Sequence, residues 1–228
     1  MIGIIGAMEI EVSALKAMIE NPVIKKISGV EFISGKIYNK EVVVATCGVG
    51  KVFSAITAEA MILAYSPDVI INSGVAGSTD ERLGIADVVV ASDVVQHDMD
   101  TTALGDPPGL LSGINIVNIP CAKKAAAVLE ECVKEENLTY LVGRIATGDE
   151  FVSTIARKME LNEKFGAVAC EMEGGSIGHV CYVNGVDFVA LRAISDSLTD
   201  ESDMEFSEFV GIAAANSVKI IDSFLKKY

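Results

Sequence analysis

Acidic residues follow short apolar runs at three points in the sequence, each beside a turn or the start of a helix. Glu11 follows GIIGAM, Glu173 follows AVACEM, and Asp196 follows FVALRAIS. Carboxyl groups at the ends of buried strands suit general acid–base chemistry, in which one group accepts a proton and another donates one. Each acid could instead only stabilise the first turn of a helix. Arg192 interrupts the last apolar run, and a buried guanidinium needs carboxylate partners, so it favours a polar pocket.

The glycine turns are poor matches to nucleotide-binding loops. GIIGAM lacks a glycine of the dinucleotide-binding pattern, and Glu9 and Glu11 follow where a pyrophosphate would bind. CGVGK lacks the Ser or Thr that a P-loop needs after Lys51, and NSGVAGS contains no cation. We therefore expect turns that approach water or a neutral ligand, with no phosphate bound.

The overall composition excludes several classes of partner. The chain has 228 residues, half of them hydrophobic, which predicts one packed domain over residues 1–228. A net charge of -14 argues against nucleic acid or an anionic membrane as partner.

Five cysteines without CxxC spacing and two histidines without ligand spacing predict neither disulfides nor a metal site. The N-terminus lacks the basic region of a signal peptide, and no apolar run could span a bilayer, so we expect a cytoplasmic protein.

Apolar runs alternate with helical patterns along the chain. The predicted strands are 2–8, 41–50, 68–77, 86–95, 140–149, 167–173 and 187–196, and the predicted helices are 8–19, 52–65, 123–137 and 207–225. Because several strands are apolar on both faces, we expect a three-layer α/β/α fold with a mixed, largely parallel central sheet. Ligands of such folds bind beyond the carboxyl ends of the strands, where the acids lie. The acid-rich run 196–206 is typical of a solvated loop, or of a lid.

The motifs GAMEIE, CEMEGG and RAISD occur in this order, with INSGVAG, QHDMDTT and TGDEFV between them. Together they resemble the 5′-methylthioadenosine/S-adenosylhomocysteine nucleosidases of the nucleoside phosphorylase superfamily, over nearly the whole chain. This resemblance implies a nucleoside phosphorylase-like fold and cleavage of the bond between adenine and a 5-thio-substituted ribose. It also implies a homodimer in which the 103–113 loop lies near the partner's site. The reaction needs no cofactor.

The resemblance also implies roles for individual residues. Glu11 matches the acid that activates the attacking water, and Asp196 matches the acid that protonates the purine. Arg192 matches the arginine that positions the water and the carboxylates, while Glu173 and Met172 match the ribose-binding pair. The other positions that match substrate-binding residues are Phe151, Val152, Val49, Ala76, Gly77, Ser195 and Thr101.

The chemistry agrees with these roles. Losing adenine leaves an oxocarbenium-like sugar, and the reaction needs a proton donor for the purine and a base for the water. Glu11 would repel phosphate, and none of the four arginines lies in the glycine turns, which favours hydrolysis over phosphorolysis. A purine nucleoside phosphorylase, an aminodeoxyfutalosine nucleosidase and an inactive nucleoside-binding protein remain alternatives. Val75 is compatible with an inactive nucleoside-binding protein, because the family often has Ser or Thr at this position.

Overall fold

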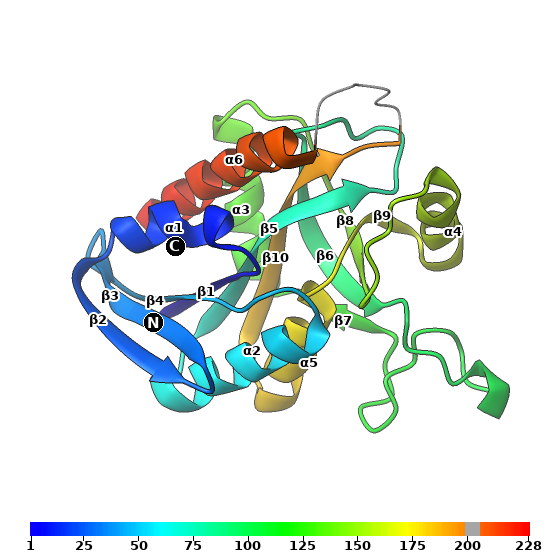
Figure 1. The fold of residues 1–228 in the computed structure, drawn as a ribbon, viewed down its shortest axis with the longest axis horizontal. Helices are drawn as coiled ribbons and strands as arrows, with labels where there is room; N and C mark the ends of the chain where they lie inside the picture. Colours follow the sequence, from blue (N-terminus) through cyan, green and yellow to red (C-terminus); the bar gives the residue numbers. More distant parts are fainter. Residues whose placement is uncertain (199–205) are drawn as a thin grey trace.

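The computed structural model describes residues 1–198 and 206–228 (Figure 1). Within these ranges ten strands form one mixed sheet. The strands are β1 (Ile2–Gly6), β2 (Glu20–Ile27), β3 (Val30–Ile37), β4 (Lys40–Thr46), β5 (Val69–Ser78), β6 (Val88–Gln96), β7 (Asn118–Pro120), β8 (Tyr140–Thr147), β9 (Ala167–Glu171) and β10 (Asp187–Asp196). The helices are α1 (Glu9–Ala17), α2 (Lys51–Tyr65), the 3-10 turn η1 (Thr102–Leu104), α3 (Lys123–Glu135), α4 (Ile155–Phe165), α5 (Gly174–Asn184) and α6 (Phe206–Lys227).

The central strands run parallel and end at the same edge. β1 pairs in parallel with β4 and β5, and β5 pairs in parallel with β10. Their register places Asn72 opposite Ile5 and Gly74 opposite Arg192. The mixed sheet expected from the sequence is therefore confirmed, and its parallel centre brings the ends of the acid-bearing strands to one rim.

The sheet also closes on itself, which the sequence pattern does not indicate. β5 pairs with β10 along one side, and its end pairs with β9 on the other side. β6 and β8 complete the ring between β10 and β9. Gly77 of β5 lies opposite Cys170 of β9. Closure thus carries β9, with Glu171 and Glu173 at its end, to the side of β5 opposite β10.

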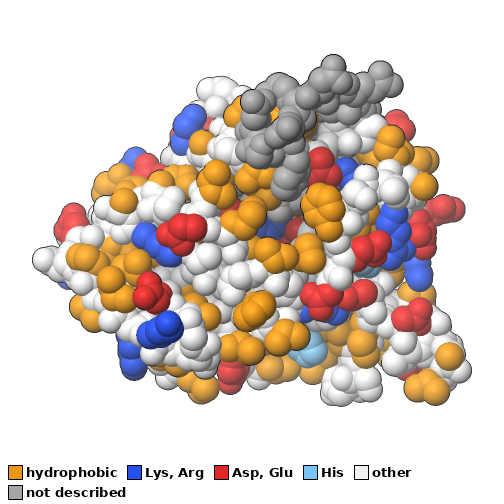
Figure 2. All heavy atoms as spheres, in the orientation of Figure 1, with side chains coloured by type: hydrophobic (Ala, Val, Ile, Leu, Met, Phe, Trp, Pro, Cys, Tyr) orange, Lys and Arg blue, Asp and Glu red, His pale blue; other side chains and the backbone are white. Residues whose placement is uncertain are grey.

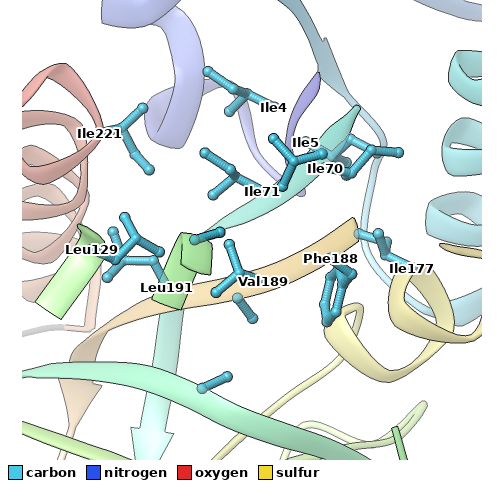
Figure 3. Packing of buried hydrophobic residues seen from close by; sticks show 14 of the residues in the cluster. Ile4, Ile5, Ile70, Ile71, Leu129, Ile177, Phe188, Val189, Leu191 and Ile221 are labelled. Atoms are coloured by element: carbon cyan, nitrogen blue, oxygen red, sulfur yellow. The ribbon is translucent and has the colours of Figure 1, made fainter. Parts of the chain in front are cut away.

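Helices cover the two faces of the sheet. In Figure 1, α1, α3 and α6 lie on one face, and α2 and α5 lie on the other. Figure 3 shows Ile221 and Leu129 packed on one side of the central strands, with Ile177 on the opposite side. The isoleucines of β1 and β5, such as Ile4 and Ile71, are completely buried. Burying one such side chain contributes about 1.5–3 kcal/mol, so the core holds the strand ends in fixed positions.

The β2–β3 hairpin, the short strand β7 and helix α4 are absent from the sequence-based prediction. The hairpin of β2 and β3 was not predicted, because β2 is exposed along nearly its whole length and has no apolar periodicity. Helix α4 was not predicted either, because a lysine, Lys158, occupies its buried stripe beside Leu161 and Phe165. Most of the acid-rich run 196–206 lies outside the described residues. No helix in the described ranges is both long enough and apolar enough to cross a membrane.

Candidate active site

Glu11 lies at the start of α1, just after the first strand, and is almost fully buried. Its Oε2 accepts hydrogen bonds from the backbone N–H groups of Ala7 (2.7 Å) and Met8 (2.9 Å), and its Oε1 accepts one from Val75 N–H (3.0 Å). Burial raises the pKa of Glu11, while the Arg192 charge and the three N–H donors act to lower it. Glu11 therefore caps its helix and also presents a fixed carboxyl group, and a raised pKa suits a base that works near neutral pH.

Arg192 is completely buried within β10. Its Nη2 donates hydrogen bonds to Glu171 Oε2 and Asn72 Oδ1, and lies 3.8 Å from Glu173 Oε2. The backbone beside the guanidinium is Gly74, where an added Cβ would clash with both Arg192 and Glu11. Arg192 thus has the carboxylate partners that a buried guanidinium needs.

Glu171 and Glu173 lie on either side of the β9–α5 junction, and both are buried. Glu171 accepts hydrogen bonds from Thr147 Oγ1 and from the N–H groups of Glu173 (3.0 Å) and Gly174 (2.7 Å). Glu173 Oε1 accepts a hydrogen bond from Gly50 N–H at 2.9 Å, so the CGVGK turn binds a carboxyl group of the protein itself. Burial, together with the neighbouring charge of Glu171, raises the pKa of Glu173 to about 7, against the lowering effect of Arg192 and the Gly50 N–H.

Asp196 ends β10 and lines a pocket that Glu11 and Glu173 also line. Its Oδ1 accepts a hydrogen bond from Ser195 Oγ at 2.9 Å, and its Oδ2 accepts one from Lys158 Nζ, forming a salt bridge. Gly77 allows the carboxyl group to approach the β5 backbone, because an added Cβ would lie 2.8 Å from Asp196 Oδ2. The Asp196 side chain keeps 30% of its exposure and faces the cavity.

The structure brings most of the residues proposed from the sequence to one pocket. The pocket is lined by Glu11, Val49, Ala76, Gly77, Phe151, Val152, Met172, Glu173, Ser195 and Asp196. Its walls also include Met8, Val75 and Cys170, so carboxyl groups project from largely apolar surroundings. Such a pocket suits a ligand with a flat apolar ring and polar edges.

Two residues proposed from the sequence lie elsewhere. Arg192 lies beneath the pocket and reaches it through Glu171 and Glu173. Thr101 does not line this pocket, and its Oγ1 donates a hydrogen bond to Asp106 at 2.8 Å. In the ranges that the structure describes, no group of three or more His, Cys, Asp or Glu side chains could hold a metal ion.

Sequence reasoning missed two charged residues of the site. Glu171 precedes Glu173 by two residues in CEME, and this spacing across a strand end was a usable signal. Lys158 shares a helical stripe with Leu161 and Phe165, and a lysine in an apolar stripe is the corresponding signal. Neither signal reveals the partner of the charged group. Arg192, the partner of Glu171, lies 21 residues further along the chain, and Asp196, the partner of Lys158, lies 38 residues further along.

The acid-lined pocket at the carboxyl edge of a mixed sheet is typical of the ligand site of an α/β enzyme, and comparisons with known proteins identify the family. A family model described as "Phosphorylase superfamily" matches residues 1–226. A 5′-methylthioadenosine/S-adenosylhomocysteine nucleosidase from Shewanella halifaxensis is 39% identical over 227 residues, covering 99% of each chain.

Solved structures give the same result. The nucleosidase of that name from Neisseria meningitidis, in complex with methylthio-immucillin-A, has a TM-score of 0.94 at 30% identity, covering 100% of this chain and 99% of the other. A futalosine hydrolase mutant of Helicobacter pylori has a TM-score of 0.93 at 36% identity, with the same coverage. The chain belongs to the phosphorylase superfamily and, within it, to the family of 5′-methylthioadenosine/S-adenosylhomocysteine nucleosidases. The fold and the nucleosidase class expected from the sequence are confirmed.

Proposed function

We propose that this protein hydrolyses the N-glycosidic bond of 5′-methylthioadenosine and S-adenosylhomocysteine, releasing adenine and the 5-thio-substituted ribose. The observation that carries the proposal is one pocket lined by Glu11 and Asp196, which come from different strand ends and have different partners. Glu11 acts as the base that activates water, and Asp196 acts as the acid that protonates the purine. Each proton transfer contributes a factor of roughly 10²–10⁴ to the rate.

The remaining lining residues fit the parts of such a nucleoside. Phe151 and Val152 offer an apolar surface to the purine, and the Glu173 carboxyl group can bind the ribose hydroxyls beside Met172. Val49 lies at the outer part of the pocket, half exposed, where a thioether tail would leave the site.

The acids of the pocket would also favour the transition state. Bond cleavage develops positive charge on the sugar, and fixed negative groups in a partly buried site stabilise that charge. Glu11, Glu171 and Glu173 surround Arg192, so three carboxyl groups face one guanidinium. When these acids are ionised, the net charge of the cluster is negative, and the sugar cation would be attracted to it.

Water is a better nucleophile for this pocket than phosphate. In the described part of the chain, the two buried cations near the pocket already have partners: Arg192 binds Glu171 and Asn72, and Lys158 binds Asp196. The Gly50 N–H is bound to Glu173, so this glycine turn does not offer that donor to an oxyanion. These contacts support hydrolysis.

The test measures adenine release from 5′-methylthioadenosine in phosphate-free buffer and identifies the sugar by mass. We expect full turnover without phosphate and a free 5-methylthioribose. Turnover that requires phosphate and yields a sugar 1-phosphate would identify a phosphorylase and refute the proposal.

A futalosine-type nucleoside is a second candidate substrate, because a futalosine hydrolase from Helicobacter pylori matches this chain over its full length. Aminodeoxyfutalosine presents the same adenine and ribose and differs in its 5′ substituent, so the same acids would act on it. A panel of kcat/KM values for 5′-methylthioadenosine, S-adenosylhomocysteine and aminodeoxyfutalosine separates the candidates. We expect the two thio-substituted nucleosides to give the higher values.

We also propose a homodimer formed through the exposed face of α2. Val52, Phe53, Ile56 and Leu63 are 42–74% exposed there, and Figure 2 shows hydrophobic side chains gathered over this part of the surface. The segment around η1 projects from the body of the protein in Figure 1, with Leu104 83% exposed. A projecting loop of this kind could reach a neighbouring subunit, which fits the expected place of loop 103–113 and of Thr101 beside it.

A further inference from the structure

Lys158 occupies an unusual position for a lysine. Among the residues that the structure describes, it is the one buried lysine, with 4% of its side chain exposed. It lies on α4 in the stripe of Leu161 and Phe165 that packs toward the sheet. A methylene-rich residue of the same size would fill this stripe without the cost of burying an ammonium group. The charge therefore calls for an explanation beyond packing.

The ammonium group is bound to the acid of the proposed reaction. Lys158 Nζ donates to Asp196 Oδ2 in a salt bridge, and it lies 3.3 Å from the Asp196 carbonyl oxygen. Ser195 Oγ binds the other carboxyl oxygen at 2.9 Å. These contacts fix the carboxyl group against Gly77 and orient it at the pocket wall.

This pairing creates a problem for the proposed chemistry, on which the inference rests. A carboxylate paired with an ammonium group has no proton to donate, but adenine is a poor leaving group unless it is protonated. A purine in the pocket would also shield Asp196 from water, since its exposed part faces that pocket. A proton must then come from within the protein, and Lys158 carries one in hydrogen-bond contact with Asp196.

We propose that Lys158 is a positioning residue that also supplies Asp196 with the proton passed to the leaving purine. As the bond between C1′ and N9 breaks, its electron pair moves to the purine and Asp196 delivers a proton to N7. The Lys158 ammonium proton moves to the Asp196 carboxylate, which leaves Lys158 neutral. After adenine leaves, Lys158 recovers a proton from solvent, and the proton that Glu11 took from water is released.

Lys158 contacts the Asp196 carboxyl group directly, and other titratable groups lie around the pair. The nearby groups are Cys170 from β9, Glu150 from the loop before α4, and Glu11, Glu171 and Glu173 across the pocket. Burial raises the pKa of the Cys170 thiol to about 12, so this thiol does not exchange protons near neutral pH. Glu150 is held by Arg157, with its Oε2 3.0 Å from Nη2.

The deciding experiment compares Lys158→Arg and Lys158→Met with the wild type. Arginine keeps the positive charge and the donors but does not give up a proton, whereas methionine keeps only the packing. Lys164→Met, on the exposed side of the same helix, is the matched control for charge loss and is expected to leave kcat unchanged. The substrates are 5′-methylthioadenosine and 4-nitrophenyl 5-methylthioriboside, whose nitrophenolate leaves without protonation.

At about pH 8.5 we expect both variants to lose roughly 100-fold in kcat on 5′-methylthioadenosine, with KM nearly unchanged. Lys158→Met should gain activity relative to the wild type as the pH is lowered from about 8.5 to about 5.5, because the solution then offers more of the protons that Lys158 no longer supplies. Both variants should cleave the nitrophenyl riboside nearly as fast as the wild type. Circular dichroism checks that each variant is folded.

Wild-type turnover by Lys158→Arg at the alkaline pH would overturn the inference, because a positioning charge would then suffice. Equal losses on both substrates at both pH values would also overturn it, because they would assign Lys158 to the scaffold alone. A wild-type enzyme that fails on 5′-methylthioadenosine in phosphate-free buffer would refute the proposed function instead, so the two failures are distinguishable.

Discussion

Gly74 is the position where the site has the least space, and Gly74→Ala tests whether the Glu11–Arg192 geometry controls activity. An added Cβ would lie 2.5 Å from Glu11 Oε1 and 3.0 Å from Glu11 Cδ, and it would also clash with Arg192 Nη1. Real Cβ atoms essentially never approach other heavy atoms below 3.0 Å, so at least one of the two charged groups has to move. Both are buried and bound by several partners, and neither can turn out to solvent.

The size of the effect follows from this crowding. Inserting a methyl group into a well-packed region costs about 1–3 kcal/mol of stability. Displacing a catalytic group by about 1 Å costs on the order of 100-fold in rate. We therefore expect Gly74→Ala to lower the free energy of unfolding by about 1–3 kcal/mol and kcat by about 100-fold.

The assay combines urea unfolding with adenine release from 5′-methylthioadenosine, and Gly211→Ala is the matched control. An added Cβ at Gly211, within α6, meets no atom within 4 Å. Alanine in a helix is more favourable than glycine by about 1 kcal/mol, so this control should be slightly more stable and fully active. Wild-type kcat in folded Gly74→Ala would refute the argument that this geometry governs catalysis.

Three further predictions address the base, the pH dependence and the assembly. Glu11→Gln should lower kcat by roughly 10²–10⁴-fold with folding intact, and near-normal turnover would reject its role as base. The pKa of Glu173 is raised from 4.5 to about 7 in the folded protein, so the native state binds more protons than the unfolded state between these values. Stability should therefore fall as pH rises from about 4.5 to 7, and Glu173→Gln should flatten this trend in urea titrations; an unchanged slope would contradict the assignment. Phe53→Glu on the exposed face of α2 should convert a sedimenting dimer into a monomer, and a wild type that is already monomeric and fully active would exclude the proposed dimer.

The sequence by itself determined the burial of the central strands and the position of the acids along them. Strands such as 68–77 and 187–196 are apolar on both faces, and this pattern alone predicts a sheet covered by helices. Since parallel strands end at one edge, Glu11 and Asp196 were expected at the same rim before any contact was known. The edge hairpin was not predicted because β2 is exposed along nearly its whole length. A strand without a buried face does not show the alternation of apolar and polar residues by which strands are predicted.

Only the tertiary structure decided which charged groups pair. The periodicity of a sequence reports how deeply each residue is buried, but it carries no information on which distant partner a buried charge meets. Closing the sheet sets β9 against β5, which brings Glu171 to Arg192, and the packing of α4 brings Lys158 to Asp196. These pairings depend on the register between strands and on the docking of a helix, and both are properties of the whole packed chain.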